Sequence, residues 1–208
     1  MVREIYPEKQ IKTPWPRIFY RETMKKYGTD KPDLRKNKDD PNEIAFGWVI
    51  DFPSFELDKE TKKIQPVHHM FVQPQEASVA LLDTEPLKMI STQYDWVCNG
   101  YELASGSIRI NDPELQMKVF KLLGMSEKKA QDDFGHLLKA FSYGVPPHGG
   151  IAPGIDRLLM ILQNEPNIRE VMAFPKTGDG RDLMMNAPSD ISKEQLKELG
   201  LVIKKNKK

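Results

Sequence analysis

The pattern of apolar and polar positions predicts strands in the first part of the chain. Residues 46–52 are rich in aromatic and β-branched side chains and end at Pro53, which is typical of a strand. Further strands are predicted around residues 67–72, after a charged hairpin-like stretch at 56–63, and in the apolar runs 96–98 and 107–110. Asn99-Gly100 separates the last two runs and indicates a tight turn or a bulge.

Helical spacing dominates the later part of the chain. Asp112-Pro113 supplies an N-cap followed by a proline in the first turn, and Ser192 with Gln195 forms a capping box. Apolar residues three and four positions apart follow each of these starts. The pattern predicts helices over residues 18–27, 113–123, 126–141, 155–162 and 192–199, a loop over 142–153 and a short strand over 170–174.

The order of these elements indicates the fold class and the domain organisation. Strands come mostly first and helices are interspersed later, which favours an α+β fold with an antiparallel sheet over a βαβ repeat. Residues 1–45 hold a proline-rich arm, a short helix and a charged linker, whereas residues 46–208 hold the main body. We therefore expect a division between these two parts.

Composition and charge narrow the functional classes. The 208 residues carry a net charge of +1, one cysteine (Cys98), no long apolar run and no apolar N-terminal segment. These features predict a cytoplasmic protein without a membrane span or an intramolecular disulfide. The charge is uneven, with +6 over residues 1–38 and a basic tail at 204–208. The remaining body is acidic, so it could hold a polyanion only at specific arginines or through a metal. The basic ends could contact RNA phosphates, although solvated ends are the simpler interpretation.

Two pairs of polar residues are candidates for site chemistry. His68-His69 falls in a predicted strand, where neighbours face opposite sides, so only one could enter a given cleft. Taken singly, either histidine is better explained by packing. Asp95 and Glu102 flank Asn99-Gly100 and could share a magnesium ion if the turn aligned them, although a solvated pair is the simpler explanation.

Two arginines are further candidates. Arg109 lies between isoleucines at the end of a strand and could grip a carboxylate with two hydrogen bonds, but an ordinary salt bridge explains it equally well. Arg157 follows the glycine-rich stretch 149–154 and falls in the first turn of a helix, where an anion is favoured. A solvated arginine at a glycine-rich helix entry is the alternative.

Longer motifs resemble the catalytic domain of bacterial-type aspartyl-tRNA synthetases, which are class II synthetases. The resemblance starts at about residue 14 and covers nearly all the chain that follows. The matching segments are Tyr27-Gly-Thr-Asp-Lys-Pro-Asp-Leu-Arg35, Trp48-Val-Ile-Asp-Phe-Pro53, His68-His69, Asn99-Gly-Tyr-Glu102, Gly106-Ser-Ile-Arg109, Tyr143-Gly-Val-Pro-Pro-His-Gly-Gly-Ile-Ala-Pro-Gly-Ile-Asp-Arg157, Ala173-Phe-Pro-Lys176 and Asp182-Leu-Met-Met-Asn-Ala-Pro188.

The resemblance implies a reaction and a role for each candidate residue. Aspartate would attack the α-phosphate of ATP, and the aspartyl group would then pass to tRNA. Asp95 and Glu102 would hold Mg2+ on the ATP phosphates, and Arg109 would bind the side-chain carboxylate of aspartate. The resemblance also implies that ATP is bound by Gly154, Ile155, Asp156, Arg157 and Glu102. Glu102 and Arg157 would be catalytic, and His68 and His69 would lie beside the amino acid.

The chain also departs from the family pattern. Family motifs 1 and 2, the anticodon-binding domain and the inserted bacterial domain have no counterpart in this sequence, and only residues 36–45 stand where the insertion would be. Ala104-Ser105-Gly106 replaces a triple glycine, which we expect to tighten the aspartate site. The resemblance thus implies a partial class II antiparallel sheet flanked by helices, with an open edge and an uncovered apolar face.

Three functions remain open from the sequence. The first is a partial catalytic domain of an aspartate–tRNA ligase that acts with a complementing N-terminal chain or as a homo-oligomer. The second is a non-catalytic paralogue that binds or regulates. The third is an aspartate-activating ligase with a non-tRNA acceptor, as in asparagine synthesis. Retention of Asp95, Glu102, Arg109 and Arg157 favours the first over the second, and the Asp-Lys-Pro-Asp-Leu-Arg segment favours it over the third.

Overall fold

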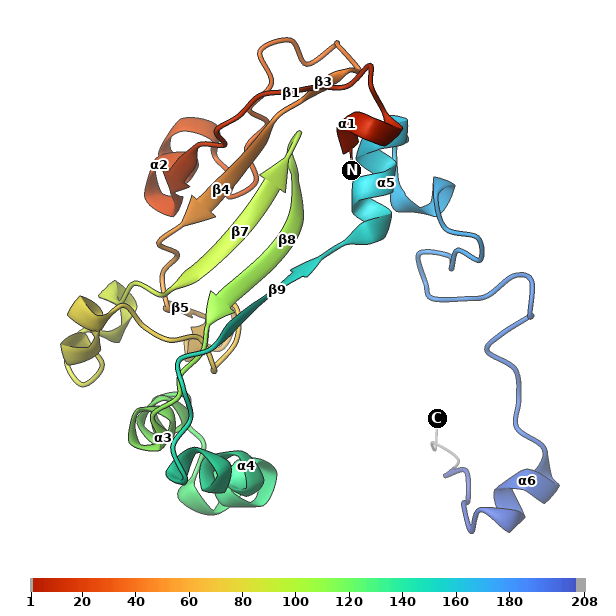
Figure 1. Cartoon of the computed structure of the whole chain (residues 1–208). Helices are drawn as coiled ribbons and strands as arrows, with labels where there is room; N and C mark the ends of the chain where they lie inside the picture. The colour runs from red at the N-terminus through yellow and green to blue at the C-terminus, as the bar shows by residue number, and fades with distance from the viewer. Residues whose placement is uncertain (1, 205–208) are drawn as a thin grey trace. The chain divides into compact units, whose positions relative to one another are not determined.

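The computed structural model describes residues 2–204 of the protein. A five-stranded sheet forms the centre of the part that precedes residue 165 (Figure 1). The strand order is β2-β4-β7-β8-β9. β2 pairs with β4 in parallel, and every other neighbouring pair in this sheet is antiparallel. The strands are β2 (Arg17–Phe19), β4 (Phe46–Ile50), β7 (Gln93–Cys98), β8 (Tyr101–Ile108) and β9 (Gly149–Pro153). The α+β class with a mostly antiparallel sheet is confirmed.

Shorter elements surround this sheet. β1 pairs in parallel with β3, and β5 forms an antiparallel hairpin with β6. Their bounds, with those of the first helix and two 3-10 helices, are α1 (Val2–Ile5), β1 (Gln10–Ile11), β3 (Glu43–Ile44), β5 (Phe55–Leu57), β6 (Ile64–Pro66), η1 (Glu76–Leu81) and η2 (Pro86–Lys88).

The predicted helices form where local signals start and stop them. α3 begins after Asp112, whose carboxylate accepts hydrogen bonds from two backbone N–H groups of the first turn. α4 begins after Ser126 in the same manner, and α2 ends at Gly28, which adopts a φ of 70°. These helices are α2 (Tyr20–Tyr27), α3 (Pro113–Leu122), α4 (Glu127–Ser142) and α5 (Ile155–Gln163).

The β7–β8 hairpin carries most of the candidate residues. Asn99 and Gly100 form its two-residue turn with φ values of 49° and 87°, as the sequence predicts. The Asn99 side chain accepts a hydrogen bond from the Ala45 N–H and donates one to the Glu43 carbonyl. Further along, the register shifts so that Leu103 is an extra residue in β8, which makes a β-bulge.

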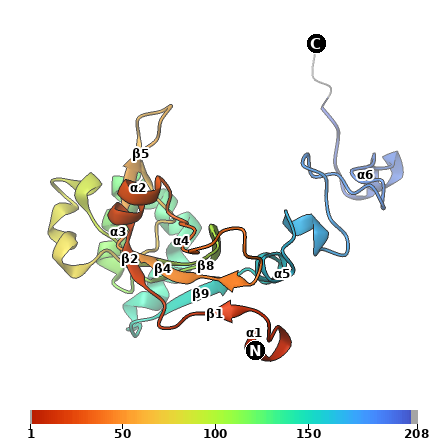
Figure 2. The same cartoon turned by 90° about the horizontal axis from the view of Figure 1, so that it is seen from above.

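The two faces of the sheet differ. α2 lies on one side of it (Figure 2), where Tyr20 packs against the buried Val49, Phe52 and Val97. The opposite face carries aromatic rings, with Phe46 stacked on Trp96 at 4.9 Å between ring centroids. An apolar cavity of about 300 Å³ opens on that aromatic face and is lined by Arg17, Trp48, Ile50 and Tyr94.

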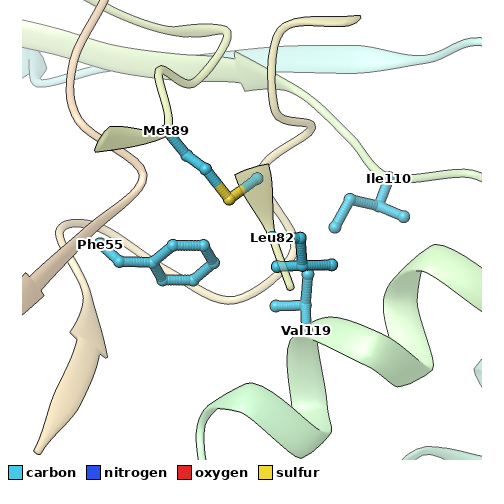
Figure 3. Packing of buried hydrophobic residues seen from close by; sticks show 5 residues of the cluster. All are labelled: Phe55, Leu82, Met89, Ile110 and Val119. Carbon is cyan, nitrogen blue, oxygen red and sulfur yellow. The ribbon is translucent and has the colours of Figure 1, made fainter. Parts of the chain in front are cut away.

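A second core joins the β5–β6 hairpin to α3. Phe55, Leu82, Met89, Ile110 and Val119 converge in it and are each at most 5% exposed (Figure 3). Burial of side chains of this size stabilises the fold by roughly 1.5–3 kcal/mol each. Because Ile110 directly follows Arg109, this core anchors the segment just after β8 on which Arg109 lies.

Three sequence predictions of local structure are wrong. Residues 67–72 form bends, turns and one isolated bridge at Val72. The strand of that hairpin lies earlier and ends at Pro66, because the Ser54 N–H that would continue the ladder donates to the Met89 carbonyl instead. Residues 142–153 are only partly a loop, since β9 occupies their second half. Residues 170–174 form no strand, since they hold the end of a 3-10 helix followed by a turn and bends. The proline-rich arm also contains the unpredicted β2.

The chain divides into two compact units at residues 164 and 165. The second unit contains η3 (Ile168–Glu170) and α6 (Lys193–Glu198), and α6 carries the predicted Ser192–Gln195 capping box. The predicted division at residues 45 and 46 stays a prediction. The basic tail after Lys204 lies outside the described residues. Among residues 2–204, the helices lack the length and apolar character that a membrane crossing requires.

Candidate active site

Asp95 is a buried carboxylate held by two neighbours on the sheet. It is 2% exposed and lies directly opposite Ser105 in the β7–β8 ladder. The Ser105 hydroxyl donates a 2.7 Å hydrogen bond to Asp95 Oδ1, and Gln93 Nε2 donates one of 3.1 Å to the same oxygen. Gln93 Nε2 also donates to Ser105 Oγ at 2.6 Å, so the three side chains form a closed triangle.

The surroundings of Asp95 shift the pKa of its carboxyl upward. Burial raises the pKa of this carboxyl above its usual value of 3.8, and the negative charge of Glu102 adds to the increase. The two hydrogen bonds and the His68 ring act in the opposite direction but do not outweigh burial. A cation placed between the two carboxylates would offset both the burial of the Asp95 charge and its repulsion from Glu102.

The hairpin turn places Glu102 on the same face as Asp95. Glu102 pairs directly with Val97, and residues two apart in a strand share a face. The sequence requires a turn or bulge at Asn99-Gly100 to align the two carboxylates, and the turn achieves this. The bulge at Leu103 has a separate effect, because it shifts Ser105 rather than Ala104 into the position opposite Asp95.

Arg157 reaches the Glu102 end of β8 from the first turn of α5. Its Nη1 atom donates to the Glu102 backbone carbonyl and lies 4.0 Å from the Glu102 carboxylate. The Gly154 N–H donates to the Leu103 carbonyl at 2.8 Å, which fixes the start of α5 against β8. The adjoining Ile155 and Asp156 are exposed beside Arg157 at the same helix start.

Arg109 and His69 form a second group at the other end of β8. Arg109 Nη1 contacts the His69 ring and lies 3.1 Å from its Nδ1. Both residues line a cavity of about 660 Å³, together with residues of α4 and the start of β9. The salt bridge that was the alternative explanation of Arg109 is not present, since Arg109 has no carboxylate within 4.0 Å among the described residues.

The contact with Arg109 and the burial of His69 keep its ring neutral. Burial is the main cause that lowers the pKa of His69 below its usual 6.5, and the positive charge of Arg109 lowers it further. A neutral imidazole can accept a hydrogen bond from the guanidinium, whereas an imidazolium would repel it.

His68 differs from His69 in its environment. His68 lies in a bend and His69 in the irregular segment that follows it, so neither is in a strand and the predicted alternation does not apply to them. His68 is exposed, and its ring meets Phe52 edge-on with 5.0 Å between ring centroids. It therefore lies nearer the Asp95 side of the site, where it contributes to the electrostatics of that carboxyl.

The β8–β9 ladder connects the two groups of residues. One end is fixed by the bond from Gly154 to Leu103, and the other by a 2.9 Å bond from the Arg109 N–H to the His148 carbonyl. Between them, β9 lies so close to β8 that a Cβ atom on Gly106 would be 2.3 Å from the Gly150 carbonyl oxygen. Only glycine fits at that position.

Sequence reasoning missed three residues at this site. Gln93 and Ser105 bind Asp95, and His148 lines the cavity beside Arg109. Gln93 could have been found, because it lies two positions before Asp95 on one strand and therefore shares its face. Ser105 depends on the bulge, which leaves no clear signal in the sequence.

The carboxylates suit a magnesium ion that also binds phosphates. Among residues 2–204, no group of three or more His, Cys, Asp or Glu side chains converges as a metal cage. Mg2+ commonly uses one or two carboxylates and completes its shell with phosphate oxygens and water. Asp95 and Glu102 fit that type of site.

Comparison with known proteins agrees with these features. A profile of the family described as tRNA synthetases class II (D, K and N) matches residues 1–178. An aspartate–tRNA(Asp/Asn) ligase of Rubrobacter xylanophilus is 60% identical over 160 residues, which are 77% of this chain and 27% of that protein. The ligase of the same name from Dehalococcoides mccartyi is 49% identical over 174 residues, covering 84% of this chain and 29% of the relative.

Solved structures share the fold at lower identity. The aspartyl-tRNA synthetase of Entamoeba histolytica superimposes with a TM-score of 0.58 at 24% identity, covering 87% of this chain and 36% of that one. The asparaginyl-tRNA synthetase of Pyrococcus horikoshii superimposes with a TM-score of 0.54 at 22% identity, covering 80% of this chain and 37% of that one. The chain spans under a third of the length of the two ligases above. From the family match over residues 1–178, we conclude that the chain belongs to the class II tRNA synthetases of the D, K and N group.

Proposed function

We propose that this chain carries the aspartate- and ATP-binding part of an aspartate–tRNA ligase. The observation that supports this most is Arg109. Its guanidinium lines a large cavity and has no carboxylate partner among the described residues. A cation in a half-buried position without an anion is suited to a carboxylate ligand. The names of the relatives at 49–60% identity supply the substrate.

Arg109 would bind the side-chain carboxylate of aspartate with two parallel hydrogen bonds. His69 holds the guanidinium from one side and leaves its other donors free. Because the His69 ring is neutral, it adds no charge that would attract a second anion. His68 would border the amino acid on the side of Asp95.

Asp95, Glu102 and Arg157 would bind ATP. Arg157 would contact the γ-phosphate and adenine, next to the exposed start of α5 at Gly154, Ile155 and Asp156. Asp95 and Glu102 would hold Mg2+, which when bound neutralises charge on the phosphates. A main-chain carboxylate oxygen of aspartate would bond to the α-phosphorus while the bond to pyrophosphate breaks. A ribose hydroxyl of tRNA would then attack the aspartyl carbonyl and release AMP.

A complementing segment would complete the site. Within the described residues, β9 pairs on one edge only, and the aromatic face around Trp48 stays partly exposed. Such an edge and face favour association with further strands and helices. The relatives are more than three times as long as the matching region, so an upstream catalytic segment is the proposed partner, with a second copy of this chain as the other candidate.

The test is calorimetric binding of a non-hydrolysable aspartyl-adenylate analogue. We expect the unchanged chain to bind it more tightly than the asparaginyl analogue. Arg109→Leu should weaken aspartyl-analogue binding by about 10- to 100-fold, the range for loss of a charged hydrogen-bonded pair. Arg17→Leu, on the opposite face, is the matched control. Equal binding by Arg109→Leu and the control would contradict the proposal.

A further inference from the structure

The hydrogen bonds to Asp95 from Gln93 and Ser105 distinguish its two carboxylate oxygens. Both hydrogen bonds to the carboxylate end on Oδ1, and Oδ2 accepts none from the described residues. The amide of Gln93 can only donate at Nε2, and an ionised carboxylate can only accept. The Ser105 hydroxyl therefore accepts from Gln93 and donates to Asp95 when that carboxyl is ionised, which gives the triangle one direction.

Two features of the backbone bring the three side chains of this triangle together. Gln93 and Asp95 share a face because they are two positions apart in β7. The bulge at Leu103 then moves Ser105 opposite Asp95, a position that the unbulged register would give to Ala104. A hydroxyl reaches the carboxylate only because the bulge and the serine occur together.

We propose that Ser105 and Gln93 are positioning residues that turn Asp95 so that its Oδ2 oxygen is the metal-binding atom. This inference rests on the proposed magnesium–ATP site and names the side chains that orient it. Groups that hold a metal-binding carboxylate in one orientation contribute to metal affinity although they do not touch the metal. Ser105 and Gln93 act on Asp95 in this way.

Ser107 offers a matched control on the same strand and face. It is fully buried, and its hydroxyl has no hydrogen-bond partner among the described residues. Ser105→Ala and Ser107→Ala thus remove the same atom two positions apart on one strand, Ser107 being the more buried of the two, and only the first breaks a bond to Asp95. Ser105→Thr restores the hydroxyl.

The experiment measures manganese binding in the presence of ATP by electron paramagnetic resonance, with melting temperatures in parallel. We expect Ser105→Ala to weaken manganese–ATP binding by about 10- to 100-fold, as is typical for such supporting residues. Ser107→Ala and Ser105→Thr should bind as the unchanged chain does. Equal affinity of Ser105→Ala and Ser107→Ala would overturn the proposal.

Two further measurements separate this inference from the proposed function. If Asp95→Asn loses manganese–ATP binding while Ser105→Ala retains it, the metal site stands and the role of Ser105 is wrong. If Asp95→Asn binds as the unchanged chain does, the metal site itself is wrong, and the inference fails with it. Without metal, NMR couplings should show one Asp95 rotamer in the unchanged chain and several in Ser105→Ala. A single rotamer in both would overturn the positioning role, including where the unchanged chain binds no manganese–ATP.

Discussion

Arg109 places its guanidinium against the imidazole of His69, forty positions earlier in the chain. The contact joins the end of β8 to the bend after β6, and both side chains face the same cavity. A histidine in this position holds the arginine without neutralising it, whereas a carboxylate would occupy the donors that the proposed aspartate ligand needs. The pair therefore combines a fixed cation with an open binding position.

Acid should weaken this contact. The pKa of His69 lies below its usual 6.5, so the unfolded chain binds more protons than the folded one between the two values. Stability therefore falls as the pH drops through this window. Urea unfolding of the unchanged chain between about pH 7.5 and 5.5 should show this loss, and His69→Gln should lack that component of it.

His68→Gln is the control for the His69 variant. It removes the adjacent exposed ring, which packs on Phe52 instead of contacting Arg109. We expect this variant to keep the pH dependence of the unchanged chain. The same pH dependence in His69→Gln as in the unchanged chain would mean that protonation of His69 does not cause the loss of stability in acid.

Asp95→Asn should be at least as stable as the unchanged chain at neutral pH without metal. The pKa of Asp95 is raised mainly by burial, so the folded chain loses stability as the pH rises from 3.8 through the raised value. Each unit of increase is worth about 1.4 kcal/mol. Urea unfolding at about pH 4 and 7 should show that the variant gains stability relative to the unchanged chain as the pH rises. A loss of relative stability over the same range would contradict burial as the cause of the raised pKa.

Asn99→Ala should destabilise the hairpin that aligns Asp95 and Glu102. The change removes two hydrogen bonds to the backbone at residues 43 and 45 and puts alanine at a φ of 49°. We expect a loss of about 2–4 kcal/mol in the free energy of unfolding. Asn99→Asp keeps the acceptor and tolerates the backbone, so its loss should be smaller. Equal losses in a urea titration would count against the side-chain bonds.

Local signals in the sequence are sufficient to predict the helices and the hairpin turn. Asp112, Ser126 and the Ser192–Gln195 box each act within one turn of helix, so their effect does not depend on the remaining fold. The same holds for Asn99-Gly100, because these two residue types favour the positive φ angles of a hairpin turn by themselves. These elements were therefore predictable without knowledge of tertiary contacts.

The parts that could not be predicted depend on long-range pairing. β9 consists largely of glycine, alanine and proline, and it becomes a strand only because Gly106 lets it approach β8. The bulge at Leu103 and the bond from Ser105 to Asp95 arise from strand register, which the local pattern does not encode. Resemblance supplied the candidate residues, but not the neighbours that orient them.

Aspartate-dependent exchange between ATP and pyrophosphate would show whether this chain takes part in the activation of aspartate. The chain would be mixed with the upstream catalytic segment of the Rubrobacter xylanophilus relative, and the same division of that relative would serve as the positive control. We expect exchange with aspartate and not with asparagine, and we expect Arg109→Leu to abolish it. Exchange by the divided relative but none with this chain, or exchange that survives Arg109→Leu, would contradict the proposed function.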